Sequence, residues 1–446
     1  MARVLPVVLL VGLTACTSVP ESTPTSTTAV ARTTTTLAAT EVYDTVAPSL
    51  AFVETDLATG SGVMVDPVTL ITNAHVVWPE TSALVTFPDG SSGRAPVVGY
   101  DWMADLALID VGVLDSLPPA AVFDMDPLPP GTPVYLVGYP ADAPDSATPA
   151  ITSGIVSRLR VWEDTGLTFI QSDALISGGQ SGGALVDDHG RVVGISGLSV
   201  GEGFALALTM ADVFDRLPGM RSDRGRDGLG GRSFVDLAGT AASSGTVPHA
   251  LDESVLVFDG HDGEPVTIGV HADDPVSADL IGPDGFVEAT TSEPGTDVSL
   301  EADLILDGPY FIVVYSDEGP VDHFEVTGVE THAWRDPDHG VTLSVGGAVA
   351  ANGDYPGDLD WFRLDLLVGQ TVTIRASSVN IDPAILIDLA PPGDDSAFDS
   401  DSDSGGGVLG FDAELTYTAP TSGTYTVAVF DETRFGPGGY IVSVED

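Results

Sequence analysis

Short runs of β-branched and aromatic residues, each ended by Gly, Pro or Asp, follow one another along this chain of 446 residues. Ala83–Phe87 and Val134–Val137 are two of them. Many short strands separated by turn residues are typical of all-β barrels and sandwiches. One helix is predicted, with Thr209 as its N-cap and Met210–Leu217 as its body, because Pro218 then ends it. The sequence therefore predicts an all-β fold.

Ser181 lies in a turn with four glycines, Gly178–Gly183, and an apolar run follows directly. Glycine allows the backbone conformations that gather N–H groups in a tight concave turn. A serine that attacks a carbonyl needs such donors, because they stabilise the oxyanion that develops. An isolated turn of this composition is more often only a turn. The motif is informative only together with a base and a carboxylate.

His75 and Asp105 are the candidates for that base and that carboxylate. His75 follows the apolar run Thr69–Ile71, whose predicted partner strand is Gly60–Val65, so we expect it at a strand end and not in a helix. Asp105 leads a short apolar strand. Taken singly, a structural histidine and a solvated acid explain them as well, but the order His, Asp, Ser is that of a chymotrypsin-type triad.

Residues 41 to about 217 resemble the HtrA/Deg branch of the chymotrypsin-like serine proteases. The matching segments are Gly60–Gly62, Thr72–His75, Asp105–Ala107, Gly138–Pro140 with Thr152–Ser157, and Ser172–Ala174 leading to Gly179–Gly183. The resemblance implies two six-stranded antiparallel barrels with the active site in the cleft between them. The family usually has asparagine just before the nucleophile, where this chain has Gln180. We expect this residue to contribute backbone geometry, so that activity survives.

The resemblance also implies a role for each triad residue. Ser181 would attack the scissile carbonyl, His75 would carry the proton, and Asp105 would hold the imidazole. The N–H groups of Gly179 and Ser181 would form the oxyanion hole. Asp101 and Asp110 are rival acids, and Asp105 is preferred because it matches the family motif and begins the strand.

Substrate recognition is predicted from two further places. Leu175 lies six residues before the nucleophile, where related proteases place a charge that binds basic side chains. We therefore expect small or medium apolar residues, and not Arg or Lys, before the cleaved bond. Ser196, Gly197 and Leu198 are expected to form the strand edge that pairs with the substrate backbone.

The N-terminus reads as a targeting segment. Residues 1–15 form a lipoprotein signal peptide, with a basic Arg3, an apolar run and the Leu-Thr-Ala-Cys sequence that ends at Cys16. This resembles a bacterial lipobox, whose cysteine becomes lipidated; an ordinary signal peptide with an incidental cysteine is the alternative. Residues 16–40, rich in Thr, Ser and Pro, form a tether. The protein is then exported, and either lipid-anchored on the outer face of the membrane or secreted.

The regions after the protease domain 41–218 are a Gly/Arg linker, 219–235, and two β-sandwiches, 236–331 and 332–446. The linker reads as a flexible hinge or as a docking or processing site for a trypsin-like enzyme. The sandwiches form an internal repeat, seen in three pairs of segments: Val266–Ile268 with Val372–Ile374, Gly308–Val314 with Gly423–Val429, and His323–Val326 with Gly439–Val442. The second copy resembles the bacterial pre-peptidase C-terminal domain, and nothing resembles a PDZ domain.

Charge limits the partners. The net charge is −51, and every one of the 15 basic residues is Arg. Such a field disfavours nucleic acid and anionic surfaces. No cofactor is expected for catalysis, but the acidic loop Asp394–Asp403 could bind calcium through its oxygens; a solvated charge run is the alternative.

The predicted function is that of an exported serine endopeptidase acting on polypeptides, with envelope protein quality control as one setting. The alternative is a cell-surface binding protein or a chaperone with an inactive or blocked protease fold.

Overall fold

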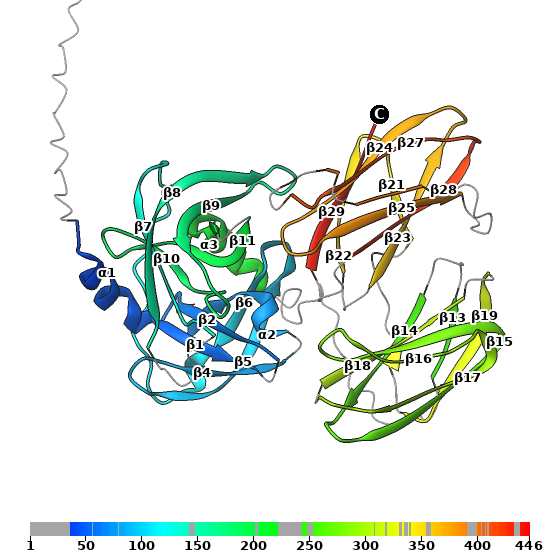
Figure 1. Ribbon diagram of the computed structural model, residues 1–446, viewed down its shortest axis with the longest axis horizontal. Helices are drawn as coiled ribbons and strands as arrows, with labels where there is room; N and C mark the ends of the chain where they lie inside the picture. Colours follow the sequence, from blue (N-terminus) through cyan, green and yellow to red (C-terminus); the bar gives the residue numbers. More distant parts are fainter. Residues whose placement is uncertain are drawn as a thin grey trace, which may run out of the picture. The chain divides into compact units, whose positions relative to one another are not determined.

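Six antiparallel strands close a first barrel in the order β1-β2-β3-β6-β5-β4, and six close a second in the order β10-β11-β12-β9-β8-β7 (Figure 1). The first six are β1 Leu50–Glu54, β2 Thr59–Met64, β3 Thr69–Thr72, β4 Ser82–Thr86, β5 Ser92–Asp101 and β6 Leu106–Asp110. The second six are β7 Pro133–Gly138, β8 Ala150–Trp162, β9 Leu167–Leu175, β10 Ala184–Asp187, β11 Val192–Val200 and β12 Phe204–Thr209. This confirms the predicted pair of barrels.

The structure is a computed structural model that describes residues 36–446 with internal gaps. The gaps are residues 56, 79, 142–147, 201–203, 222–242, 248–252, 307, 317–318, 330–331, 334–337, 339, 354–357, 390–398, 403, 406, 408–409 and 432–437. The predicted signal peptide, Cys16 and most of the tether lie outside the described residues, as do most of the Gly/Arg linker and residues 394–398 of the acidic loop. Residues 36–446 form one compact unit.

Strand β6 shows how the barrels are built. Its residues are all buried up to Ile109, but successive side chains point to opposite faces of a strand. Leu106 and Leu108 enter the core shared by the two barrels, whereas Ala107 and Ile109 enter a second core within the first barrel. The shared core also takes Val137 of β7 and other apolar residues of the second barrel. The two barrels are therefore packed against each other through one continuous apolar layer.

Three α-helices are described: α1 Ala39–Val46, α2 Ala74–Val77 and α3 Met210–Met220. Short 3₁₀ turns are η1 Ala47–Ser49, η2 Trp102–Ala104 and η3 Val111–Val113. Thr209 caps α3 as predicted, since its hydroxyl accepts a hydrogen bond from Asp212 N. The predicted stop at Pro218 is wrong. The helix continues because Arg221 N still donates to Leu217 O and because Met220 is buried in the shared core.

The remaining strands form the two β units that were predicted as sandwiches. The first is one eight-stranded sheet connected through β15, and the second consists of a five-stranded and a four-stranded sheet. The first holds β13 Ser243–Val247, β14 Glu253–Gly260, β15 Pro265–Ile281, β16 Val287–Thr290, β17 Gly295–Asp303, β18 Gly308–Tyr315, β19 Val321–Thr327 and β20 His332–Ala333. The second holds β21 Val341–Leu343, β22 Gly347–Gly353, β23 Leu359–Leu366, β24 Thr371–Ser378, β25 Pro383–Leu389, β26 Asp399–Ser402, β27 Ala413–Thr418, β28 Gly423–Asp431 and β29 Gly438–Glu445. β20 pairs with β14, so residues 332–333, predicted in the second unit, extend the first.

Strand pairing confirms the internal repeat. In the second unit β24 pairs with β27 and β29, and β28 pairs with β23 and β25. In the first unit the long strand β15 corresponds to two strands of the second unit, β24 and β25. Its first half pairs with β17 and β19, and its second half pairs with β18. β18 in turn pairs with β14. The three segment pairs found in the sequence thus occupy equivalent strands.

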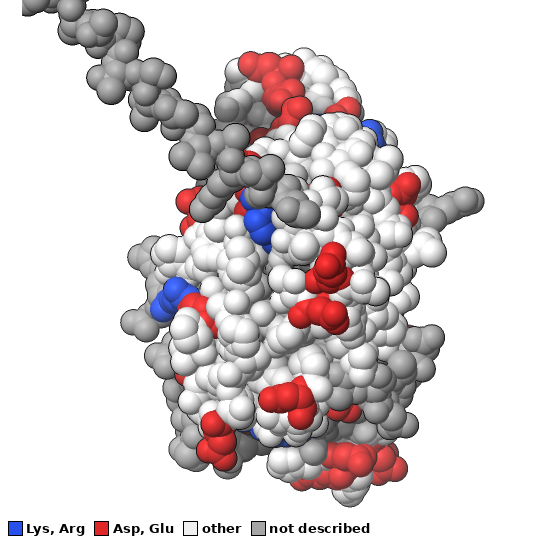
Figure 2. All heavy atoms as spheres, turned by 90° about the vertical axis from the view of Figure 1, so that its left-hand side faces the viewer, with Lys and Arg blue, Asp and Glu red and all other residues white. Residues whose placement is uncertain are grey.

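The surface agrees with the composition. Figure 2 shows a face on which Asp and Glu side chains are scattered widely and Arg side chains occur at few places. In the described part of the chain, none of the helices has the length and apolar character needed to cross a bilayer.

Candidate active site

His75 and Asp105 form a close pair. His75 Nδ1 lies 2.7 Å from Asp105 Oδ2, and the backbone N–H of His75 donates to Asp105 Oδ1 at 3.1 Å. The carboxylate is 2% exposed, whereas the imidazole is 46% exposed. Both oxygens of Asp105 therefore face His75, one toward the ring and one toward the main chain. This arrangement fixes the ring by its Nδ1 side and leaves Nε2 for other chemistry.

His75 lies in a helix, which corrects the prediction that it would not. β3 ends at Thr72, and Asn73 follows in an extended conformation. The chain then makes a single helical turn, α2, because Trp78 N donates to Ala74 O at 3.0 Å. The position just after a strand was predicted correctly. The one-turn helix was missed because a turn this short has no apolar periodicity of its own.

Asp105 is held in an unusual backbone conformation. Its φ is +50°, and it is the one non-glycine residue with positive φ in the described part of the chain. Aspartate is among the few residues that adopt this left-handed region readily. The turn is secured from outside, since the carbonyl of Asp105 accepts hydrogen bonds from Asn73 Nδ2 at 2.7 Å and from Ala74 N at 3.3 Å. The His75 and Asp105 segments are thus tied together by main-chain and side-chain bonds.

The two rival acids have other partners. Asp101 caps η2 by accepting from Ala104 N, and Arg216 Nη1 donates to its Oδ1 at 2.9 Å and to its Oδ2 at 2.8 Å. Asp110 accepts from Gly112 N at 2.9 Å at the start of η3. Neither is bonded to His75.

The turn that carries Ser181 is held by the first barrel. Ser61 of β2 is fully buried, and its N–H donates to Ser181 O at 2.7 Å. Its hydroxyl donates to Gly179 O at 2.9 Å and accepts from Tyr139 N at 2.8 Å. Ser61 was noted in the sequence only as part of a motif, and its role was missed. Gly60 and Gly62 on both sides of it were the signal, because the absence of side chains allows the two backbones to approach.

The N–H groups of Gly179 and Ser181 are available to a ligand. Gly178 O accepts from Ala141 N at 2.8 Å. The carbonyl and the N–H of a trans peptide point in opposite directions, so the N–H of Gly179 points away from Ala141. Within the described residues, neither this N–H nor that of Ser181 has a recorded hydrogen-bond partner. Two N–H donors that have no partner among the described residues, with one residue between them, are the arrangement that an oxyanion requires.

The Ser181 hydroxyl is half-buried and lies 3.5 Å from Gly197 O. No hydrogen bond joins it to the imidazole of His75 among the described residues. Catalytic hydrogen bonds are often long or misaligned in unliganded sites and shorten only with substrate bound. Rotation about the Cα–Cβ bond of Ser181 is one motion that changes the partner of its hydroxyl.

Gln180, the residue that departs from the family pattern, also uses its side chain. Its Oε1 accepts from Ser177 N at 2.9 Å and from Ser177 Oγ at 3.2 Å, and its carbonyl accepts from Ser196 Oγ at 2.7 Å. It is 2% exposed. The expectation for Gln180 was a role of its backbone. Its side chain adds to that role, because it binds Ser177 and so closes the turn that precedes Ser181.

The predicted recognition residues lie on two strands. β11 pairs with β10 only up to Ile195, and beyond it only with β12, so one edge of residues 197–200 has no partner strand among those described. Leu175, at the end of β9, is 67% exposed and is the cross-strand neighbour of Phe204. Among the described residues, no hydrogen bond joins Leu175 to Ser181. Its place in a substrate pocket stays a prediction.

Electrostatics favour a protonated imidazole more than in free histidine. Removal from water lowers the pKa of His75, but the charge of Asp105 and the hydrogen bond to its carboxylate together raise it by more. The pKa of His75 therefore lies above its usual value.

One cluster of possible metal ligands occurs in the described part of the chain, formed by Asp187, Asp188 and His189. Asp187 is already used, because Oδ1 accepts from the N–H groups of His189 and Arg191 and Oδ2 accepts from Arg191 Nε at 2.8 Å. These bonds close a turn between β10 and β11. Serine, histidine and aspartate chemistry needs no metal or cofactor.

Gly182 tests how tightly the turn is packed. Its φ is +80°, and a Cβ atom there would lie 2.0 Å from Ser61 O and 2.5 Å from Thr72 Oγ1. Gly90 has φ +85° and an added Cβ would meet nothing within 4 Å. Gly90→Ala should cost about 1–2 kcal/mol of unfolding free energy, the strain alone. Gly182→Ala should cost about 4 kcal/mol or more, measured by urea denaturation, because backbone atoms must move. Equal losses would show that the turn can give way.

Comparison with known proteins agrees with this geometry. Residues 60–195 match the trypsin-like peptidase domain. Serine protease HTRA1A of Danio rerio is 35% identical over 178 residues, which are 37% of this chain and 36% of that protein. Serine protease PepD of Mycobacterium tuberculosis is 29% identical over 255 residues, which are 47% of this chain and 55% of that protein.

Among solved structures, the serine endoprotease from Yersinia pestis matches with 29% identity and a TM-score of 0.37, covering 42% of this chain and 67% of that one. The chain spans 36% and 55% of the lengths of the two curated relatives. Residues 60–195 thus form a trypsin-like peptidase domain, that of a serine-type endopeptidase similar to the HtrA serine proteases.

Proposed function

We propose that the whole chain is an active serine endopeptidase that cleaves polypeptides through an acyl-enzyme. The observation that carries the proposal is the 2.7 Å contact between His75 Nδ1 and Asp105 Oδ2, beside a turn with two free N–H donors. A histidine with a purely structural role needs no buried carboxylate at its Nδ1. It also needs no neighbouring serine turn whose N–H groups lack partners among the described residues.

In the proposed reaction Ser181 Oγ attacks the scissile carbonyl carbon as its proton moves to His75 Nε2. The N–H groups of Gly179 and Ser181 stabilise the oxyanion. The proton then passes from Nε2 to the leaving amine, the C–N bond breaks and an acyl-serine remains. Water then attacks the ester carbonyl as His75 takes its proton; the C–Oγ bond breaks, His75 returns the proton to Ser181 Oγ, and the carboxylic acid product leaves. Asp105 stays ionised throughout and stabilises the imidazolium.

Fluorophosphonate labelling of the full-length protein tests the proposal. A fluorophosphonate reacts only with an activated serine, and peptide mapping should place the adduct on Ser181. Casein digestion by the same preparation should proceed in parallel. A wild-type protein that is neither labelled nor able to digest casein would favour the alternative, a binding protein or chaperone with a blocked protease fold.

The substrate preference is proposed from Leu175. A peptide library should show small or medium apolar residues before the cleaved bond, and a profile dominated by Arg and Lys would contradict this. Leu175→Asp should raise the relative kcat/KM for Arg and Lys by only about fivefold, because an exposed ion pair contributes at most about 1 kcal/mol. Val113→Asp is the control, since Val113 is similarly exposed at 59% but lies in the first barrel.

The setting is also a proposal. Export, a lipid anchor on Cys16 and a role in envelope protein quality control are supported by the N-terminal sequence and by the similarity to HtrA proteases. Polypeptides are the proposed partners, and the charge of −51 disfavours nucleic acid. Calcium binding by the acidic loop stays a prediction.

A further inference from the structure

The carbonyl of Trp102 accepts hydrogen bonds from two parts of the chain. Asp105 N donates to it at 3.2 Å, which closes the 3₁₀ turn η2 and sets the start of the Asp105 turn. Asn380 Nδ2, two residues beyond β24 of the second sandwich, donates to it at 2.7 Å. A carbonyl can only accept, so the amide nitrogen of Asn380 must face it. The sandwich thus binds the same oxygen that holds the main chain of Asp105.

The backbone of the second sandwich also touches this turn. Gly439 of β29 lies so close to Met103 that an added Cβ would be 2.8 Å from Met103 N and 2.9 Å from Met103 Cα. Val379 belongs to the core shared by the two barrels, and Met103 packs against that same core. Ser378 Oγ donates to Gly439 O at 2.8 Å, which joins the two sandwich segments that make the contact. The sandwich therefore contacts the η2 turn through its main chain as well as through the side chain of Asn380.

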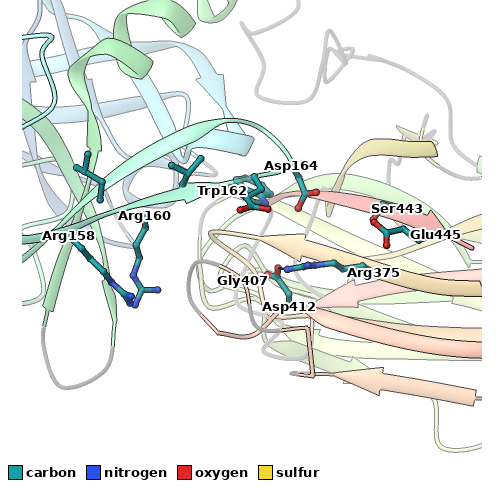
Figure 3. A pocket seen from close by; sticks show the side chains of 12 residues that line it. Arg158, Arg160, Trp162, Asp164, Arg375, Gly407, Asp412, Ser443 and Glu445 are labelled. Carbon is teal, nitrogen blue, oxygen red and sulfur yellow. Dashed lines mark hydrogen bonds and ion pairs between the residues drawn. The ribbon is translucent and has the colours of Figure 1, made fainter. Parts of the chain in front are cut away.

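A second contact lies beside the first. Ser377 of β24 donates its hydroxyl proton to Asp164 Oδ2 at 2.6 Å and accepts from Trp162 Nε1 at 3.1 Å. Figure 3 shows Trp162 and Asp164 on the β8–β9 hairpin, directed toward the strands that carry Arg375. Ser377 is 1% exposed, so these bonds are shielded from water. Both barrels are thus fixed to the end of one sandwich strand.

Aromatic side chains connect η2 to the histidine helix. Trp102 stacks on Tyr100 with ring centroids 5.4 Å apart and meets the edge of Trp78 at 5.7 Å. Trp78 is the C-cap of α2, the helix that carries His75. The same buried cluster includes apolar side chains of the first sandwich, namely Val255, Val257, Ile281, Phe311 and Val313. Trp102 therefore contacts both partners' segments: its carbonyl binds Asp105 N, and its ring packs on Trp78 at the end of the His75 helix.

We propose that the second sandwich is a positioning element of the catalytic pair: Asn380 and Gly439 hold Trp102 and Met103, and through them keep Asp105 in register with His75. The inference rests on the proposed function. Asn380 touches no reacting atom and acts only through the turn. Even for aspartate the left-handed conformation is less common than the right-handed one, so the bonds around Asp105 help to hold it, and the sandwich supplies part of that constraint.

Three variants of the full chain and one control separate this role from simple folding. Asn380→Ala removes the hydrogen bond to Trp102 O. Asn380→Asp keeps the size and shape of the side chain. It replaces the NH₂ donor, which lies 2.7 Å from Trp102 O, by a carboxylate oxygen that repels this carbonyl. Gly439→Ala pushes a Cβ against Met103. The control is Gly353→Ala. Gly353 of β22 pairs with Gly438, the residue before Gly439, and its added Cβ would meet only Gly438 O at 3.9 Å.

Each protein is measured in three ways: the rate of fluorophosphonate labelling, kcat and KM for a peptide, and the pKa of His75 by NMR titration. Asn380→Asp and Gly439→Ala should lower kcat and the labelling rate about tenfold with KM unchanged, since even a 1 Å misplacement can cost about 10²-fold. Asn380→Ala should have a smaller effect, about threefold. In all three the pKa of His75 should fall toward its usual value, because Asp105 is less well aligned. Gly353→Ala should match the wild type.

The outcomes distinguish this inference from the proposed function. If the wild type is not labelled at all, the proposed function fails, but the NMR titration still reads the alignment of His75 and Asp105. If the wild type is labelled and both Asn380→Asp and Gly439→Ala retain its rate and its His75 pKa, the positioning role is overturned. A lower melting temperature with unchanged kcat and pKa would also overturn it, because the contact would then serve stability alone.

Discussion

Replacing Ser181 by alanine should lower kcat for peptide hydrolysis by about 10⁶-fold and abolish fluorophosphonate labelling. The reason is that the proposed reaction makes the Ser181 hydroxyl the nucleophile, and alanine offers no oxygen in its place. Triad members act as a unit, so loss of the nucleophile leaves only binding and the N–H donors, which alone give about 10³–10⁴-fold over water. The measurement is kcat on a peptide substrate, with the labelled fraction read from the same samples.

Ser177→Ala is the matched control. Ser177 lies in the same turn, but its hydroxyl donates to Gln180 Oε1 at 3.2 Å and plays no part near His75. Its removal should change kcat by no more than a few-fold, because its main-chain N–H still donates to Gln180 Oε1. Cleavage by Ser181→Ala at the wild-type rate would mean that a contaminating protease or another residue performs the chemistry.

Much of the barrel fold could be predicted from the sequence because its strands carry local signals. Ala83–Phe87 and Val134–Val137 are apolar runs bounded by turn residues; the first lies on β4 except for Phe87, and the second lies wholly on β7. The order of the three candidate residues predicted a pair of His75 and Asp105, and these two are in contact at 2.7 Å. The role of Ser181 as their third member stays a prediction. These inferences required only neighbours along the chain and one family pattern.

Features that depend on distant residues could not be predicted. Pro218 ends most helices, but burial of Met220 in the shared core extends this one. The role of Ser61 depends on a hydrogen bond to Gly179, 118 residues away. Asn380 meets Trp102 across 278 residues of sequence. No local pattern distinguishes such residues from ordinary polar residues near a turn, because their partners are supplied by the tertiary fold.

Replacing Asp105 by asparagine should lower kcat by about 10⁴-fold while leaving the fold intact. The structure supplies the reason. The backbone N–H of His75 is a fixed donor to Oδ1, so the amide oxygen of asparagine should take that place and its NH₂ group should face the ring. His75 Nδ1 must then accept a hydrogen bond, which puts the ring proton on Nε2. An imidazole in this tautomer cannot take the proton of Ser181.

The same substitution should move the pH profile. A general base works only when neutral, so kcat/KM of the free enzyme rises with pH through the pKa of His75. The carboxylate of Asp105 raises that pKa, and the neutral amide removes the charge that does so. The acid limb of kcat/KM for Asp105→Asn should therefore shift to lower pH, at a much lower plateau.

Asp110→Asn provides the comparison, because it makes the same chemical change at the other end of β6. Asp110 caps η3 through Gly112 and does not bond to His75, so its variant should keep the wild-type plateau and acid limb. Its stability should also change little, because asparagine caps about as well as aspartate and its Oδ1 can still accept from Gly112 N. If instead Asp105→Asn kept full activity and Asp110→Asn lost it, the orienting carboxylate would be Asp110, and His75 would have to adopt a different rotamer during catalysis.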